Sequence, residues 1–294
     1  MKQPASLFSM VMCFVMMHVF LPVSHAQNND AVTAKHIVRS TLTGRSYELR
    51  VMLPAGYSAA DALRYPVLYL LDGKFSFPLF YALKNNFDLG KELKELIIVS
   101  IEGTGKSRED WLANRHHDFT PTGLPKADTI WSNILKIPVE KLRSGGAKNF
   151  LQVLQQEILP MIDSNYKTNG DRGLYGHSLG GLFASYCLLS APGLFNRYAI
   201  NSPSLWWNGN EILALENEWA KQHKEMPATV FLSMGSLEGD LMLNPFHAFM
   251  NSMKAHEYKG LQLTTQVFDK ETHLSVVPAC SSRTLKTLYG LNSK

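Results

Sequence analysis

Cysteine is scarce in this chain of 294 residues, and too few occur to build a disulfide framework. The chain has three cysteines, and beyond residue 26 only Cys187 and Cys280 remain. Small folds that depend on disulfides are dense in cysteine, so the chain does not belong to that class. For this pair the sequence leaves two readings open, a single bridge or two buried free thiols.

A strong excess of one charge is also absent. Lys and Arg number 29 against 25 Asp and Glu, which gives a formal net charge of +4. No stripe of basic residues stands out, so we expect no nucleic acid partner. Internal repeats and low-complexity tracts are missing as well, which excludes repeat architectures. The 45 % apolar and 18 % charged residues fit an ordinary globular protein.

The first 26 residues carry almost no charge. Lys2 is the only charged side chain there, residues 7–23 are nearly all apolar, and Ser24-His25-Ala26 supplies small residues before Gln27. This layout is typical of a secretory signal peptide. We therefore expect a periplasmic or secreted protein, without stable membrane insertion after cleavage. A retained anchor is the alternative, because about 17 apolar residues is the short limit for crossing a bilayer.

The remainder, residues 27–294, alternates short apolar runs with segments of helical periodicity. Continuous apolar runs indicate strands buried on both faces, which are typical of parallel sheets. The alternation predicts one α/β domain, a mostly parallel twisted sheet with helices on both faces. The expected strands are 36–42, 47–53, 66–71, 96–101, 174–175, 198–200, 229–233 and 263–268, and the expected helices are 150–162, 182–189, 211–224 and 245–256.

Residues 103–148 do not follow this alternation. The segment is long, polar and interrupted by Pro121, Pro125 and Pro138. Long segments of this kind in compact domains usually have a function, so we expect a lid or a substrate-facing insert.

Gly176-His177-Ser178-Leu179-Gly180 stands between an apolar run and an apolar helix. A sharp strand-to-helix turn projects its central residue above the sheet, and small residues two positions before and after it avoid collisions. The helix amino terminus also favours negative charge. The pattern predicts that Ser178 is a nucleophile.

A serine nucleophile needs a base and usually an acid, which follow it in this order of strands. His273 comes after the apolar run that ends at Phe268, and we predict it as the base. Glu238 and Asp240 both follow the strand ending at Ser233. We prefer Glu238 as the acid, with Asp240 or a dyad without an acid as alternatives.

The oxyanion formed during acyl transfer needs two N–H donors. One is expected from the backbone of Leu179, directly after the serine. The other is expected from the loop after residues 67–71, where Asp72-Gly73 can turn amides inward, and we nominate the Lys74 N–H.

Three further side chains are candidates for substrate binding. Trp206 and Trp207 follow a predicted strand, where they either wall a pocket or pack in the core. Arg115 either holds a polar group of the substrate or is an ordinary loop charge. The neighbouring pair His116-His117 shows no third ligand at metal-binding spacing, so we expect no metal and no cofactor.

Several stretches of the chain together carry a family resemblance. They are Tyr65–Gly73, Arg115–Pro121, Ser144–Ala147 with Phe150-Leu151, Glu157–Pro160, Gly176–Gly181, Ser202–Trp207 and His273. The chain resembles the putative esterase family of α/β-hydrolases, which includes esterase D, feruloyl esterases and mycolyltransferases. It is most similar to the branch of siderophore esterases that open enterobactin- and bacillibactin-type trilactones. The resemblance implies a serine esterase fold with Ser178 as nucleophile and His273 as base.

The function that follows is a secreted serine carboxylic-ester hydrolase that works through an acyl-enzyme on a small-molecule ester. A siderophore-type lactone is the substrate class that the resemblance suggests. The sequence leaves two alternatives: an acyltransferase or thioesterase with the same machinery, and a catalytically inactive binding protein with the same fold.

Overall fold

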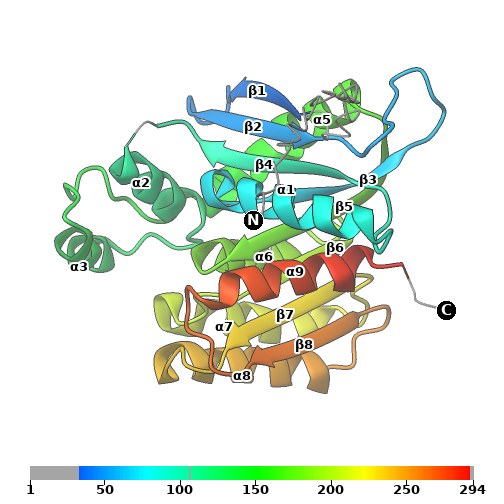
Figure 1. Ribbon diagram of the computed structural model, residues 1–294. Helices are drawn as coiled ribbons and strands as arrows, with labels where there is room; N and C mark the ends of the chain where they lie inside the picture. The colour runs from blue at the N-terminus through cyan, green and yellow to red at the C-terminus, as the bar shows by residue number, and fades with distance from the viewer. Residues whose placement is uncertain (1–32, 106, 292–294) are drawn as a thin grey trace, which may run out of the picture. The chain divides into compact units, whose positions relative to one another are not determined.

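The computed structural model describes residues 33–105 and 107–291, which belong to one compact unit. The predicted signal peptide, residues 1–26, lies outside the described residues. Within the described ranges eight strands form one sheet, in the order β1-β2-β4-β3-β5-β6-β7-β8 (Figure 1). The strands are β1 (Thr33–Arg39), β2 (Ser46–Met52), β3 (Tyr65–Leu70), β4 (Ile97–Gly103), β5 (Thr168–His177), β6 (Arg197–Asn201), β7 (Thr229–Gly235) and β8 (Gln262–Phe268).

The sheet is parallel from β4 to β8 and antiparallel only at one end. β2 pairs antiparallel with both β1 and β4, and the other neighbours are parallel. β3 is buried at every residue, as expected of a central strand. Its Pro66 lies where the register between β3 and β5 shifts. Proline has no backbone N–H, and at an irregular position of this kind no hydrogen bond between the strands is lost. The predicted α/β fold with a mostly parallel sheet is confirmed.

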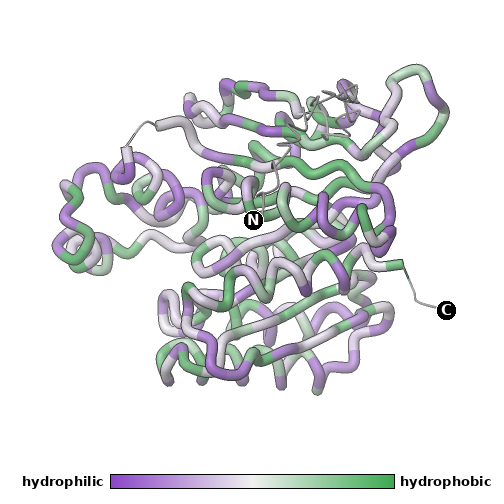
Figure 2. The backbone as a smooth tube through the Cα atoms, viewed as in Figure 1, coloured by the Kyte–Doolittle hydropathy of each residue, from purple (hydrophilic) through white to green (hydrophobic). Residues whose placement is uncertain are grey.

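Helices cover both faces of the sheet. The helices of the described part of the chain are α1 (Gly73–Leu89), α2 (Arg108–Asp118), α3 (Pro125–Leu135), α4 (Ala147–Val153), η1 (Leu154–Ile158), α5 (Leu159–Asn165), α6 (Leu179–Ser190), α7 (Trp207–Gln222), α8 (Asp240–Ala255) and α9 (Val276–Tyr289). In Figure 1, α1 and α9 lie in front of the sheet, while α6, α7 and α8 lie behind it. Each face has its own apolar core, the larger one under α4 to α8 and the smaller one under α1 and α9. Figure 2 shows the hydrophobic central strands between them.

The connections reverse direction between β3 and β5. The chain leaves β3 through α1 toward β4 on one side, and returns to place β5 on the other side of β3. In open α/β sheets ligands bind at such a reversal, outside the carboxyl ends of the strands. Asp72 follows β3 and Ser178 follows β5, so both lie at this point.

Several elements differ from the expectation. The expected 36–42 strand ends at Arg39, because residues 40–45 form a turn in which the Ser40 N–H donates to the carbonyl of Arg45 and the Gly44 N–H donates to the carbonyl of Ser40. The 150–162 helix continues through the π-helical turn η1, where the N–H of Leu159 donates to the carbonyl of Leu154 just before Pro160. This wider turn accommodates the proline without breaking the helix.

Two helices, α1 and α9, were not predicted. α1 begins where the sequence suggested only an Asp-Gly turn, and it carries Pro78 inside its span. α9 buries a face at helical spacing that includes Ser281 and Thr284 among its apolar residues, so its apolar pattern is interrupted in the sequence. The segment 103–148, expected to be a lid or a substrate-facing insert, contains two more helices that were not predicted, α2 and α3. Pro125 is the first residue of α3, a position that tolerates proline.

Cys187 and Cys280 are both buried and unbridged. They lie on α6 and α9, which pack on opposite faces of the sheet. Burial raises the pKa of each thiol to about 12, so both stay protonated. Among residues 33–105 and 107–291, no helix combines the length and apolar character needed to cross a membrane.

Candidate active site

Ser178 occupies a strained turn between β5 and α6. Its backbone has φ 61° and ψ −119°, a region that residues other than glycine rarely adopt. The turn is held by the Ser178 N–H, which donates to the carbonyl of Asn201 at 3.1 Å. The hydroxyl therefore projects from the carboxyl end of β5 at the amino terminus of α6, as the sequence predicts for a nucleophile.

The glycines around this turn are not equally constrained. A Cβ on Gly176 would lie 2.1 Å from the carbonyl oxygen of Gly180, and one on Gly181 would lie 2.9 Å from the carbonyl oxygen of Asn201. A Cβ on Gly180 would meet nothing closer than 3.4 Å, the carboxylate of Asp72. The expectation that Gly180 must be tiny is therefore corrected: the backbone requires Gly176 and Gly181.

His273 and Glu238 lie in line with the serine. The Ser178 hydroxyl donates to Nε2 of His273 at 2.9 Å, and Nδ1–H of His273 donates to Oε2 of Glu238 at 2.6 Å. His273 follows β8 and Glu238 follows β7, so two neighbouring loops at the same edge of the sheet deliver them. The arrangement can remove a proton from Ser178 and stabilise the imidazolium that results.

Glu238 is buried and fully hydrogen-bonded. Its side chain has 0 % exposure, and Oε1 accepts from the Ser202 hydroxyl at 2.6 Å and from the Gly235 N–H at 2.7 Å. Burial alone would raise the pKa of Glu238, but its hydrogen bonds from the imidazole, the hydroxyl and the amide outweigh burial and hold the pKa below its ordinary value. Asp240 is exposed as the first residue of α8. Of the two carboxylates, the structure brings Glu238 to His273.

His177 and Ser204 are two neighbours of the triad that the sequence did not single out. The His177 ring packs on the His273 ring with centroids 4.6 Å apart. Burial, helped by the nearby His273, lowers the pKa of His177 to about 3, so this ring stays neutral. The Ser204 hydroxyl lies 3.4 Å from that of Ser178.

Ser202 is a third residue that sequence reasoning missed. It follows β6 with φ 42°, and its hydroxyl holds Glu238 from a loop 36 residues away. The available signal was its place in Ser202–Trp207, one of the stretches that carry the family resemblance. Nothing local in the sequence shows that its hydroxyl faces Glu238.

The two predicted oxyanion donors lie in different surroundings. Leu179 is the first residue of α6, where N–H groups have no partner within the helix. The N–H of Lys74 instead donates to Oε2 of Glu102 at 2.9 Å, and Lys74 lines a cavity that does not contain Ser178. The nomination of Lys74 is therefore corrected, because a carboxylate of the chain already occupies its amide.

Arg115 reaches the site from α2 but is already paired. Its Nε and Nη2 donate to the two carboxylate oxygens of Asp72 at 2.9 and 3.1 Å, and its guanidinium lies 5.1 Å from the Trp111 ring. Arg115 borders both cavities that meet at Ser178. A substrate carboxylate would have to compete with Asp72 for it.

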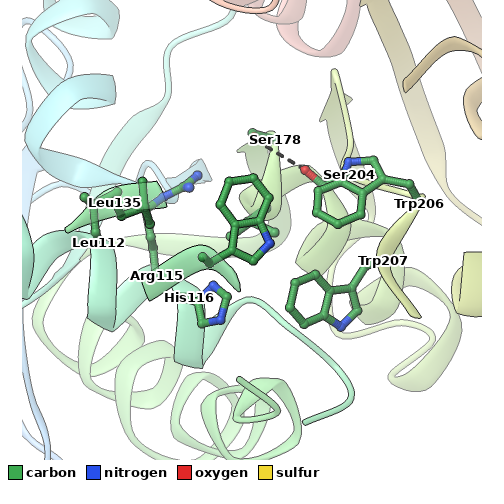
Figure 3. A pocket seen from close by; sticks show the side chains of 10 residues that line it. Leu112, Arg115, His116, Leu135, Ser178, Ser204, Trp206 and Trp207 are labelled. Carbon is green, nitrogen blue, oxygen red and sulfur yellow. Dashed lines mark hydrogen bonds between the residues drawn. The ribbon is translucent and has the colours of Figure 1, made fainter. Parts of the chain in front are cut away.

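Trp206 and Trp207 line the smaller of these cavities (Figure 3). In the figure they lie on one side of it, with Leu112 and Leu135 on the other and Ser178 at its edge. Trp207 is also a core residue, 1 % exposed, whose N–H donates to the carbonyl of Thr122. Trp206 is half-buried, so the two readings left open by the sequence both apply.

The histidines of α2 have carboxylate partners. His116 pairs with Asp128 at 2.8 Å, and His117 with Asp118 at 2.9 Å. Burial lowers the pKa of His116 despite its carboxylate partner. Over the described part of the chain, no cluster of three or more His, Cys, Asp or Glu side chains is arranged to hold a metal ion.

A family model described as putative esterase matches residues 40–271. The chain is 28 % identical over 266 residues to ferri-bacillibactin esterase BesA of Bacillus subtilis, covering 86 % of this chain and 88 % of that protein. It is 33 % identical over 162 residues to the apo-salmochelin esterase of Escherichia coli, covering 53 % of this chain and 46 % of that protein.

A similar solved structure is an IroE-like serine hydrolase from Shewanella oneidensis. The two superpose with a TM-score of 0.72 at 28 % identity, over 87 % of this chain and 79 % of that chain.

Proposed function

The chain belongs to the putative esterase family, and from this premise we propose that it is a serine hydrolase of siderophore-type esters that forms an acyl-enzyme. The observation that carries the proposal is the hydrogen-bonded line from Ser178 through His273 to the buried Glu238. A strained, projecting serine with a base in contact is the arrangement that acyl transfer requires.

The reaction proceeds in two halves. Oγ of Ser178 attacks the ester carbonyl while His273 Nε2 takes its proton, and the oxyanion accepts a hydrogen bond from the N–H of Leu179. The alcohol leaves with the proton from His273. Water then attacks the acyl carbon while His273 Nε2 takes its proton; the bond from that carbon to Ser178 Oγ breaks, Oγ receives the proton from His273, and the acid is released.

Two names among the relatives support a siderophore ester as substrate. One relative is named for a ferric siderophore and the other for an apo-siderophore. The site offers aromatic walls beside Ser178, which suit a flat ring on the ester. We further propose that the protein acts in the periplasm or outside the cell, on the strength of the signal-like layout of residues 1–26.

The test combines active-site labelling with hydrolysis. A fluorophosphonate should label the wild-type protein at Ser178 alone, and Ser178→Ala should lose both the label and the hydrolysis of nitrophenyl esters and a ferric trilactone. Ser204→Ala is the matched control, since it removes the nearest other hydroxyl and should still be labelled. Labelling or turnover that survives in Ser178→Ala would exclude the proposed nucleophile.

A further inference from the structure

Two cavities of different size meet at Ser178. The smaller has a volume of about 160 Å³ and the larger about 590 Å³. Leu179 borders only the smaller one, and His273 borders only the larger one. The expected oxyanion donor and the base thus lie on different sides of the nucleophile.

The position of His273 decides which part of an ester enters which cavity. In acylation the bond between Ser178 Oγ and the carbonyl carbon forms, and the bond between that carbon and the alcohol oxygen breaks. The serine proton passes to Nε2 of His273 and from there to the departing alcohol oxygen. That oxygen must come within hydrogen-bond reach of Nε2, so the alcohol part extends into the larger cavity.

The smaller cavity has walls that suit one uncharged ring. Its walls are the indoles of Trp131, Trp206 and Trp207 together with leucine side chains, and Trp131 packs against Trp206 with ring centroids 6.0 Å apart. Its two charged or titratable neighbours are already paired, Arg115 with Asp72 and His116 with Asp128. An apolar cavity of roughly 150 Å³ is large enough for a molecule the size of benzene.

The larger cavity is open and bordered by exposed apolar side chains. Phe75 is 57 % and Leu274 76 % exposed at its rim, and Phe75 packs edge-on against Trp111 at 4.8 Å. A bulky alcohol part can extend past this rim without displacing buried groups.

We propose that the smaller cavity binds the acyl part of the ester and accepts one uncharged ring-sized group, while the larger cavity binds the alcohol part with little restriction on size. The inference rests on the proposed esterase function and deepens it. In a cyclic ester of repeated units, the remainder of the ring system occupies the larger cavity.

Three esters test the inference, because two of them enlarge either the acyl part or the alcohol part of the third. Relative to benzyl benzoate, benzyl 2-naphthoate adds a ring to the acyl part, and 2-naphthylmethyl benzoate adds the same ring to the alcohol part. The acyl change should lower kcat/KM by about tenfold or more, whereas the alcohol change should alter it by less than about threefold. This comparison needs only the wild-type protein.

Paired variants assign the effect to the cavities. Trp206→Ala enlarges the smaller cavity. The fold loss in kcat/KM for benzyl 2-naphthoate relative to benzyl benzoate should therefore be about tenfold smaller in this variant. Leu274→Ala changes the rim of the larger cavity and should leave the ratio of kcat/KM between these two esters unchanged.

Reversed preferences, with the naphthylmethyl ester slow and the naphthoate fast, would overturn the inference. Labelling of Ser178 by a fluorophosphonate without turnover of any of the three esters would also overturn it, while leaving the proposed nucleophile in place. Absence of both labelling and turnover would instead reject the proposed function, and the inference with it.

Discussion

Glu238 supports His273 through a single short hydrogen bond, and no other carboxylate is placed to do so within the described residues. In Glu238→Gln an amide can hold the imidazole in the wrong tautomer, so kcat should fall by about 10³- to 10⁴-fold. Asp240→Asn is the control, because this exposed carboxylate should be dispensable for turnover. Steady-state kinetics on a nitrophenyl ester separates the two, and near-native rates in both variants would indicate a Ser178–His273 dyad.

Ser202 is a positioning residue that acts through Glu238. Ser202→Ala removes the 2.6 Å hydrogen bond to Oε1 and leaves the backbone turn with a similar side-chain size. We expect kcat to fall by about 10- to 100-fold, in line with the loss of other groups that orient catalytic residues, while KM stays near its wild-type value. A rise in KM or a large drop in the midpoint of thermal unfolding would indicate a merely structural role.

At the scale of elements, the turn from β5 to α6 depends on two backbone contacts. Gly176→Ala places a Cβ against the Gly180 carbonyl, which should cost about 1–3 kcal/mol of stability and, by misplacing Ser178, about 100-fold in kcat. Gly180→Ala is the matched control in the same motif and should be tolerated, because its Cβ makes only ordinary contacts. Circular dichroism melts and ester kinetics check both, and equal damage from the two variants would contradict this account.

Glu102 joins the end of β4 to the start of α1, and its ionisation should weaken the fold. Burial, assisted by the nearby Asp72 carboxylate, raises the pKa of Glu102 from 4.5 to about 7, although the Lys74 N–H opposes this. Between these values the folded state binds more protons than the unfolded state, so the contribution to stability is fully present below pH 4.5 and is lost as the pH rises through about 7.

Glu102→Gln keeps an acceptor for the Lys74 amide and removes the titration. Between about pH 5 and pH 8 the variant should therefore gain about 1–2 kcal/mol of unfolding free energy relative to the wild type. Urea unfolding at several pH values measures this difference, with the exposed Glu95→Gln as control. A difference that does not change with pH would show that Glu102 is ionised throughout.

For the whole molecule, the prediction to test is whether the chain is exported, because this decides the environment in which the site works. If residues 1–26 are a signal peptide, the exported form begins at Gln27, and Ala26→Tyr should block processing because cleavage needs a small residue there. Ala31→Tyr, beyond the cleavage point, is the control and should be processed normally. Amino-terminal sequencing gives the answer, and an intact Met1 form in the membrane fraction would favour an anchor.

The sequence by itself predicted the class of fold, which the structure confirms, and it singled out Ser178 and His273, which the structure brings into hydrogen-bond contact. Buried strands appear as continuous apolar runs, and the turn around Ser178 depends on contiguous residues, so both are readable locally. His273 could be chosen because it follows the last strand at the expected edge. Helices α1 and α9 were missed, since the apolar periodicity that identifies a helix is interrupted in both.

Only the tertiary structure decided how the groups around the triad are paired. Glu238 and Asp240 are two residues apart on one loop, and the choice between them follows from burial and from Ser202 on a different loop. The same holds for the Lys74 amide, which Glu102 occupies, and for Arg115, which Asp72 occupies. Such pairings depend on which loops meet at the edge of the sheet, because hydrogen bonds are made between neighbours in space whatever their separation along the chain.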